Sequence, residues 1–292
     1  MIEVIFLLAL ALIWIIFASV QDLRQREVAN WLNFSLIVFA LGFRFFYGLF
    51  GQQGFGLFYQ GLIGLGFFFI LGNVFYYSRV FAGGDAKLII ALGAILPLSE
   101  NFLVNLQYFL GFLLISFIVG AVYGLIWSII LTVRNFNEFR KEFPRQFRKL
   151  KLISIFSLIA GIILLILAFS LGILFLYLSV LCFILPLLLV YSKTIDEACM
   201  VKAVNVKKLT EGDWLYHDIR IGNKTIKTSW DGLTKKEIEM IKKKFKTIKI
   251  KQGIPFVPVF LISFVGFIAL FYYGILLGSQ ISFFSGFFTS FS

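Results

Sequence analysis

The chain has 292 residues, of which 60% are hydrophobic and only 14% are charged. Soluble domains carry about 25% charged residues, so this composition excludes a soluble globular protein and indicates a polytopic membrane protein. The formal net charge of +12 does not indicate nucleic-acid binding, because the basic residues lie in loops between apolar runs, as expected for cytoplasmic loops beside anionic headgroups. The two scattered cysteines make neither a zinc site nor a disulfide framework, so no metal and no cofactor is expected.

The first apolar run, Ile2–Val20, is about as long as the roughly 20 residues that a spanning helix needs. We expect a retained helix rather than a secretory signal, because Glu3 occupies the place of a basic leader and no small-residue cleavage site follows. Arg24 and Arg26 follow the run. Basic residues favour the cytoplasmic side, so the sequence predicts an outer N-terminus.

Two further spans are expected before the glycine-rich stretch at residues 81–87. Trp31–Phe50 contains Arg44 in its outer half, and we expect this side chain to snorkel outward. Leu57–Tyr77 ends close to Arg79, on the inner side. Apart from Arg44, every Lys and Arg lies on the inner side of the proposed topology, which supports this orientation.

The middle of the chain contains apolar runs of unusual length. Leu88–Leu98 is short for a crossing, so we expect either a helix that begins inside at Asp85 and stops at Pro97 or a partly inserted one. Leu103–Val133 is long enough that it must tilt or project. Arg134–Lys151 is expected to be a basic loop.

The next run, Ile153–Tyr191, is apolar over about twice the length of a span and is interrupted by Ser170 and Gly172. A helical hairpin with a very tight outer turn is therefore expected.

The segment Lys193–Lys251 differs in kind, because it is polar and carries 15 Lys or Arg residues against 8 Asp or Glu residues. Alternation, turn residues and a capping box predict a small α+β domain. Its elements, in order, are a strand at Val201–Val206, a hairpin of Leu215–Ile221 and Lys224–Thr228 around Gly222-Asn223, a helix capped by Thr234 and Glu237 that runs to Phe245, and a strand at Thr247–Lys251.

The fold class expected is therefore a polytopic α-helical membrane protein with about eight apolar helical segments, one of them short. A small cytoplasmic α+β domain is inserted before the last span, Phe256–Leu277. The domains are residues 1–192 as the transmembrane core with the hairpin, 193–255 as the α+β domain, and 256–292 as the last helix and tail. The tail, Gln280–Ser292, is expected in the outer interface.

Two acids lie at the inner ends of predicted spans. Asp22 follows the first run, and Asp85 follows Gly83-Gly84 before the short run. An acid at a membrane boundary is costly and marks a functional site. Two carboxylates at one depth titrate as a pair, so the ionised acid can take a proton from water while the protonated acid donates to a carbonyl oxygen. The glycines let a substrate backbone approach closely, and Lys87 is expected to anchor the inner face or to lower the pKa of Asp85.

Other interpretations fit the same residues. Asp85 could cap the helix that follows it, and Asp22 could be a solvated loop residue beside Arg24. A transporter with two functional carboxylates would favour acids near the bilayer midplane and an internal repeat, and we find neither. A membrane scaffold without chemistry leaves the Gly-Gly-Asp stretch unexplained.

Two motifs carry a resemblance to a known family. Asp22–Asn30 reads DLRQREVAN and resembles the first aspartate motif of prepilin peptidases, in which Val/Ile-Pro-Asn begins six positions after Asp. Ala82–Lys87 reads AGGDAK and resembles their Gly-x-Gly-Asp-x-Lys motif. The C-terminal region of the archaeal members is similar to three more segments: residues 209–214, residues 232–234 and residues 253–258.

The resemblance implies a membrane aspartic endopeptidase that cleaves class III signal peptides of prepilin or archaellin (preflagellin) precursors at the cytoplasmic face. It implies Asp22 and Asp85 as the catalytic pair, and Asn30 and Lys87 as supporting residues. Presenilin-like and signal-peptide-peptidase-like proteases also use a Gly-x-Gly-Asp aspartate. They resemble the chain less, because their two acids lie late and are followed by a Pro-Ala-Leu motif that we do not find.

The chain departs from the family pattern at two positions. Ala29 replaces the usual Pro, and Ala82 replaces the first Gly of Gly-x-Gly-Asp. Because alanine tolerates a positive φ poorly, Ala82 puts in doubt how tightly the backbone turns before Asp85. Many bacterial members carry an N-terminal domain with paired Cys-x-x-Cys motifs and methylate the trimmed product. We find no such domain, so a peptidase without methyltransferase activity is expected.

The partners expected are prepilin or archaellin precursors and the lipid bilayer, without nucleic acid. The sequence indicates no oligomeric state. The basic helix at Lys235–Lys246 is expected to rest on anionic headgroups. His217, the one histidine, has no ligand partner at metal-binding spacing and is expected at the surface or in packing.

Overall fold

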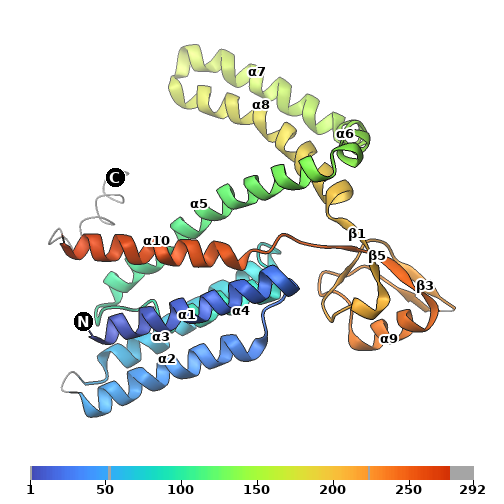
Figure 1. The fold of residues 1–292 in the computed structure, drawn as a ribbon. Helices are drawn as coiled ribbons and strands as arrows, with labels where there is room; N and C mark the ends of the chain where they lie inside the picture. Colours follow the sequence, from blue (N-terminus) through green and yellow to red (C-terminus); the bar gives the residue numbers. More distant parts are fainter. Residues whose placement is uncertain (1, 52–53, 223, 277–292) are drawn as a thin grey trace. The chain divides into compact units, whose positions relative to one another are not determined.

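The computed structural model describes residues 2–51, 54–222 and 224–276 (Figure 1). The chain forms two compact units, one of residues 1–124 and 254–292, the other of residues 125–253. The sequence-based division at residues 192 and 255 stays a prediction. The predicted interfacial tail, Gln280–Ser292, lies outside the described residues.

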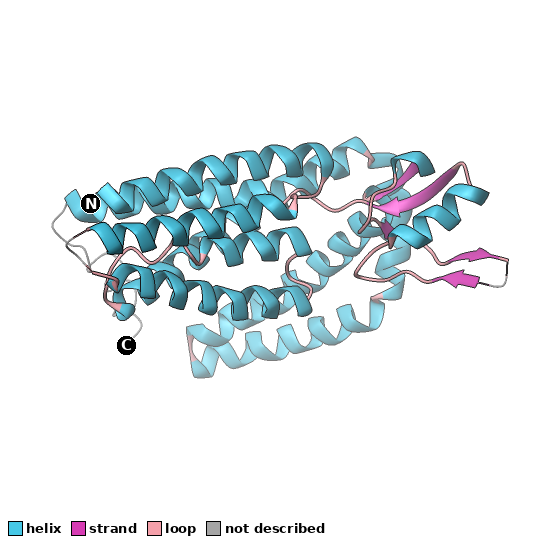
Figure 2. Ribbon diagram, turned by 90° about the horizontal axis from the view of Figure 1, so that it is seen from below, coloured by secondary structure: helices cyan, strands magenta, loops and turns pink. Residues whose placement is uncertain are grey.

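The first unit is a bundle of helices that lie side by side (Figures 1 and 2). The helix α1 packs on α2 and α10, and α4 packs between α2 and α3. The bounds are α1 Ile2–Gln25, α2 Asn30–Phe50, α3 Gly56–Tyr77, α4 Gly83–Leu92, α5 Phe102–Arg134, which continues into the second unit, and α10 Val257–Leu276.

The second unit combines a helical hairpin with a small sheet region. Its helices are α6 Phe136–Lys149, α7 Lys151–Leu171, α8 Ile173–Thr194, the single turns η1 Ile195–Cys199 and η2 Val206–Lys208, and α9 Lys235–Lys244. The strands β1 (Val201–Asn205), β5 (Thr247–Lys251) and β2 (Trp214–Leu215) form an antiparallel sheet in that order, and β3 (Ile219–Ile221) pairs with β4 (Lys224–Ile226). The capping box of Thr234 and Glu237 is present, as predicted.

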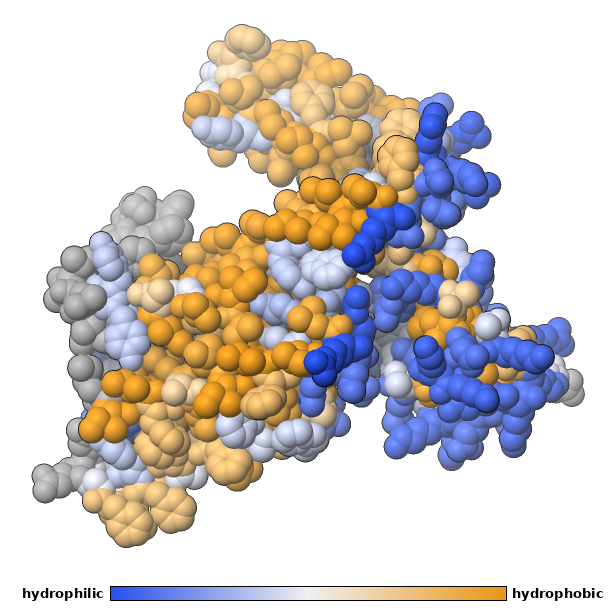
Figure 3. Space-filling model, in the orientation of Figure 1, coloured by the Kyte–Doolittle hydropathy of each residue, from blue (hydrophilic) through white to orange (hydrophobic). Residues whose placement is uncertain are grey.

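Among the described residues, six helices are long and apolar enough to cross a membrane: α1, α2, α3, α5, α7 and α8 with its continuation to Cys199. The chain is therefore a multi-pass membrane protein. Exposed large apolar side chains cover these helices (orange in Figure 3), as lipid-facing surfaces require. The apolar stretch of α10, Val257–Tyr273, is shorter, and α4 has only ten residues, too few to cross.

Close contact between α3 and α4 depends on glycine. A Cβ on Gly64 would meet the backbone carbonyl of Gly93 and the ring of Pro97, and a Cβ on Gly72 would lie 2.6 Å from the Ile90 side chain. Small residues at such crossings let helix backbones approach. This packing encloses α4, in which Leu88 and Ile89 are almost fully buried.

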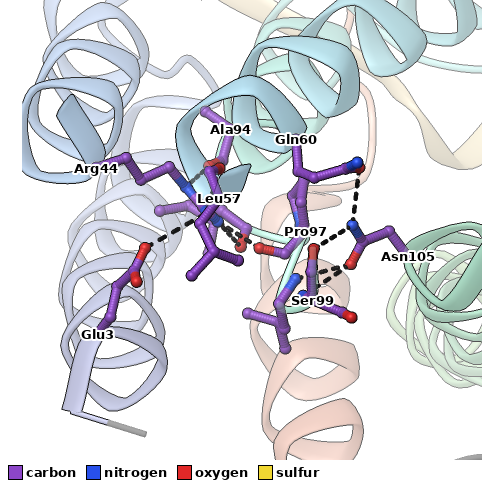
Figure 4. Close-up of polar contacts among 10 residues, drawn as sticks. Glu3, Arg44, Leu57, Gln60, Ala94, Pro97, Ser99 and Asn105 are labelled. Carbon is purple, nitrogen blue, oxygen red and sulfur yellow. Dashed lines mark hydrogen bonds and ion pairs between the residues drawn. The ribbon is translucent and has the colours of Figure 1, made fainter. Parts of the chain in front are cut away.

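The helix α4 ends at Leu92 rather than at Pro97, the predicted stop, and the chain after it remains buried without helical structure. Non-helical backbone in a membrane protein needs partners from the protein itself. Arg44 supplies them, because its guanidinium donates to four backbone carbonyls (Figure 4): Leu57 (2.9 Å), Ala94 (3.1 Å), Ile95 (3.1 Å) and Pro97.

The prediction that Arg44 snorkels outward is therefore wrong. Arg44 is 1% exposed and lies 3.7 Å from the carboxylate of Glu3, which is also buried. Asn105 holds the next part of the same segment by accepting hydrogen bonds from the backbone amides of Leu98 and Ser99. Arg44 points inward because leaving the buried carbonyls without a donor would cost more free energy than desolvating the one guanidinium that serves all of them.

Two further expectations in the second unit need correction. The segment Arg134–Lys151, predicted as a loop, contains the helix α6. The predicted strand Leu215–Ile221 is divided between β2 and β3, which belong to different sheets. The hairpin prediction for the apolar run is confirmed: α7 and α8 meet at Gly172, whose φ of 102° suits a residue without Cβ.

Candidate active site

Asp22 lies in the last turn of α1 and is only 6% exposed. The helix ends a few residues later because Arg26 adopts a left-handed backbone with φ of 59°, a conformation that costs a non-glycine residue of order 1 kcal/mol or more. Its backbone amide still bonds the carbonyl of Asp22 at 2.9 Å. The turn fixes Asp22 at the end of α1 and directs the next residues toward α2.

Asp85 is the third residue of α4 and is 8% exposed. Helical backbone begins at Gly83, and the amide of Ala86 closes the first turn on the carbonyl of Ala82 at 3.0 Å. An acid in the first turn interacts favourably with the helix dipole. Asp85 is thus not the cap residue of the alternative interpretation, since that position belongs to Ala82.

The two carboxylates interact electrostatically. Burial raises the pKa of the Asp85 carboxyl from its usual 3.8 to about 7, and the negative charge of Asp22 adds to this rise. Like charges in close proximity disfavour double ionisation. The charge of Asp22 therefore acts on Asp85, although the two residues lie on helices far apart in sequence.

A backbone donor holds Asp22. The amide of Val257, the first residue of α10, donates to Oδ2 of Asp22 at 2.9 Å, and both groups are buried. The positive end of the helix dipole lies at such an N-terminus and favours a carboxylate there. Aromatic packing supports the arrangement, because Phe81 contacts Phe256 and Phe260 at ring distances of 5.6 Å.

The remaining predicted site residues surround the pair without all reaching it. Lys87 donates to Oδ1 of Asn30 at 2.7 Å and so joins α4 to the start of α2. Burial and Asp22 raise the pKa of Asp85 and the backbone of Ala82 lowers it, and the expected effect of Lys87 on that pKa stays a prediction. A Cβ on Gly84 would make ordinary contact with Val28 at 3.7 Å, and one on Gly83 with Tyr76 at 3.7 Å.

Residues 9–125, which contain both aspartates, match the model of the type IV leader peptidase family. The chain is also 30% identical over 141 residues to a preflagellin peptidase of Methanococcus maripaludis (strain C6 / ATCC BAA-1332). That alignment covers 46% of this chain and 60% of the length of the relative. No solved structure matches the chain significantly.

The two departures from the family's motifs leave the backbone unstrained. Ala82 has φ of −70°, which any residue adopts, so the doubt raised by the missing glycine does not apply. Ala29 has φ of −62° and ψ of 133°, close to the conformation that proline would impose. Its amide donates to Oε1 of Gln21 at 3.2 Å, a bond that a proline could not make.

Sequence reasoning missed two residues beside Asp22. Val257 acts through its backbone, which no side-chain pattern reveals. Arg26 lies close enough to Asp22 and Tyr123 for their charges to act on it: burial lowers the pKa of Arg26, and those two groups raise it. A signal for Arg26 was present, because it lies four positions after Asp22 on a helix that ends there.

Proposed function

We propose that the chain is an aspartic endopeptidase that removes the leader, a class III signal peptide, from prepilin-like or archaellin-like precursors. The charge coupling between Asp22 and Asp85 inside a segment of the leader-peptidase family carries this proposal. The name of the preflagellin peptidase relative supports the substrate class. The proposal includes no N-methylation of the trimmed product.

The different surroundings of the two acids suggest their roles. Asp22 receives the Val257 amide and the nearby charge of Arg26, both of which favour a carboxylate. Asp85 has a pKa raised to about 7, so a large share of its carboxyl groups carries a proton near neutral pH. In this scheme Asp22 is the general base and Asp85 the general acid.

The hydrolysis follows from these roles. Asp22 takes a proton from a water molecule as the water oxygen attacks the scissile carbonyl carbon, and Asp85 gives its proton to the carbonyl oxygen. When the tetrahedral intermediate collapses, the C–N bond breaks and the leaving amine takes the proton that Asp22 had accepted. Asp85 recovers its proton as the carbonyl re-forms, so both acids return to their starting states.

The other predicted residues have supporting roles in this proposal. Gly83 and Gly84 leave the approach to Asp85 open to a substrate backbone. Lys87 and Asn30, joined by their hydrogen bond, hold α4 against the start of α2 and so fix the depth of Asp85. No cofactor takes part.

The membrane arrangement belongs to the same proposal. The eight apolar helical segments are α1, α2, α3, α5, α7, α8 and α10, with α4 the short one. The N-terminus lies outside the cell membrane, and the aspartates and the α+β region lie on the cytoplasmic side. The basic residues after α1 and in α6 support this orientation.

Co-expression with a tagged preflagellin-type precursor tests the function. We expect the wild-type chain to shorten the precursor at its leader boundary, as mass spectrometry of the product would show. Asp22→Asn and Asp85→Asn should each abolish the shortening, whereas Glu239→Gln, which changes an exposed acid of α9, should leave it intact. Continued cleavage in either aspartate variant contradicts the pair, and methylation of the new N-terminus contradicts the peptidase-only activity.

A further inference from the structure

The helix α6 has one face that packs on the protein. The ring of Phe139 lies 5.6 Å from the ring of Phe143 and 5.7 Å from the ring of Tyr191 on α8. Gln146 lies on the same side and is buried, and it donates to Glu142 at 2.8 Å. This face is therefore already occupied by α8.

The opposite face of α6 is basic and exposed. Successive residues of a helix are separated by about 100°, which gathers five exposed basic side chains on one side: Arg140, Lys141, Arg145, Arg148 and Lys149. Of the two acids, Glu142 is half-buried and bonds Arg145 and Gln146, and the charge of Glu138 acts on Cys199 of η1. Glu142 is thus directed toward the protein, whereas Glu138 is exposed, so the outer side carries five basic side chains against one acid.

Two more phenylalanines lie where the basic and packed faces meet. Phe136 is 56% exposed and Phe147 is 42% exposed. The helix also connects α5, which ends at Arg134, to α7, which begins at Lys151, and both are candidate membrane spans. In Figure 3 the blue surface around α6 adjoins the orange surface of the α7–α8 hairpin. The position of α6 is therefore the end of two apolar helices, where a bilayer has its headgroups.

We propose that α6 is an interfacial helix whose outer face binds the headgroups of anionic phospholipids. A helix with a cationic face and exposed aromatic side chains at its border lies in the headgroup layer, with the rings at the acyl boundary. Anionic headgroups attract each basic residue near the surface.

Nucleic acid would satisfy the charges equally well. It would leave Phe136 and Phe147 in water and would not explain why α6 directly joins two spans.

Native mass spectrometry of the full-length, delipidated protein in detergent tests the proposal. Phosphatidylglycerol and phosphatidylcholine are titrated separately against the wild type and two variants. One variant carries Arg140→Gln, Lys141→Gln and Arg148→Gln. The matched control carries Lys207→Gln, Lys224→Gln and Lys227→Gln, which remove three exposed charges from the α+β region outside α9.

We expect the α6 variant to bind phosphatidylglycerol about tenfold or more weakly, with phosphatidylcholine binding unchanged and the control variant close to wild type. Equal losses in both variants, or no loss in the α6 variant, would overturn the proposal. The proposal would also be overturned if a short RNA bound the wild type through the same three residues while phosphatidylglycerol did not bind.

A second measurement does not depend on the folding of the charge variant. A spin label is attached at Phe147→Cys in a Cys182→Ala, Cys199→Ala chain reconstituted in vesicles of phosphatidylcholine and phosphatidylglycerol. Accessibility to oxygen and to a water-soluble nickel chelate should place the label about 5–10 Å below the headgroups. A label as accessible to the chelate as one at exposed Lys236→Cys would contradict an interfacial α6.

Discussion

Asp22 accepts a hydrogen bond of 2.9 Å from the backbone amide of Val257, although 235 positions separate the two residues. The end of α1 is thereby joined to the start of α10, and the two helices pack against each other. The bond and the nearby Arg26 favour the ionised form of Asp22, whereas the Asp85 carboxyl is buried and its pKa is raised. In the proposed mechanism this asymmetry decides which aspartate is the base.

Val257→Pro removes this donor while changing little else, because proline is well tolerated at the first helical position. A hydrogen bond to a charged group contributes about 1.5–3 kcal/mol, so we expect kcat for leader cleavage to fall about 10- to 100-fold. Val257→Ala keeps the amide and should lose only a few-fold in kcat. Equal kcat values for the two variants would show that the bond does not serve catalysis.

The raised pKa of Asp85 makes stability depend on pH. In the folded protein this carboxyl ionises near pH 7, whereas in the unfolded chain it ionises near its usual 3.8. The contribution of the protonated Asp85 carboxyl to the free energy of unfolding is therefore fully present below about pH 4, and it is lost as the pH rises toward 7. Relative to wild type, Asp85→Asn should gain little at pH 4 and up to about 4 kcal/mol at pH 7.5.

Unfolding in detergent at the two pH values measures this difference. Glu239→Gln serves as the control, because its carboxyl is exposed on α9 and should show no difference between the two pH values. An Asp85→Asn variant whose stability relative to wild type is the same at pH 4 and pH 7.5 would contradict the raised pKa.

Arg44 should be essential for folding rather than for chemistry. Its guanidinium serves three carbonyls after α4, the carbonyl of Leu57 at the start of α3 and the Glu3 carboxylate. Breaking a buried charged network by removing one partner costs about 3–5 kcal/mol. Arg44→Lys keeps the charge but cannot reach all the carbonyls, so we expect most of that loss. Thermal unfolding compares it with Arg24→Lys, an exposed arginine of α1. An Arg44→Lys variant as stable as wild type would refute the role.

Glycine packing between α3 and α4 gives a matched pair of variants on one helix. A Cβ on Gly64 would collide with the backbone of Gly93, whereas a Cβ on Gly66 meets nothing within 4 Å. Alanine is favoured over glycine in helices by up to about 1 kcal/mol, so Gly66→Ala should be neutral or stabilising. Gly64→Ala should lower the melting temperature, since overpacking costs about 1–3 kcal/mol. Similar melting temperatures for the two variants would contradict the close packing.

Much of this arrangement follows from the sequence because it rests on local composition. Apolar runs predicted the spanning helices, and the capping residues Thr234 and Glu237 predicted the start of α9. Both acids became candidates because each lies beside the end of an apolar run, where an ionisable residue marks a possible functional site.

The features that the sequence did not reveal depend on distant partners. Arg44 was expected to turn outward because its carbonyl partners come from a segment whose loss of helix could not be foreseen. Residues 136–149 were predicted to be a loop because they are highly charged. Only their contact with α8 shows that they form a helix with two faces. Ala29 departs from the family's proline, and its compensating bond to Gln21 is visible only in three dimensions.

The most direct test of the aspartate pair is the kcat of purified full-length protein on a fluorogenic peptide that spans a preflagellin leader boundary. We compare Asp22→Asn, Asp85→Asn, the double variant and Glu239→Gln. If the acids act as one unit, each single variant loses at least about 10³-fold, and the double variant is no worse than the singles. Cleavage above 10% of wild type in either single variant, or losses that multiply in the double variant, would contradict the pair.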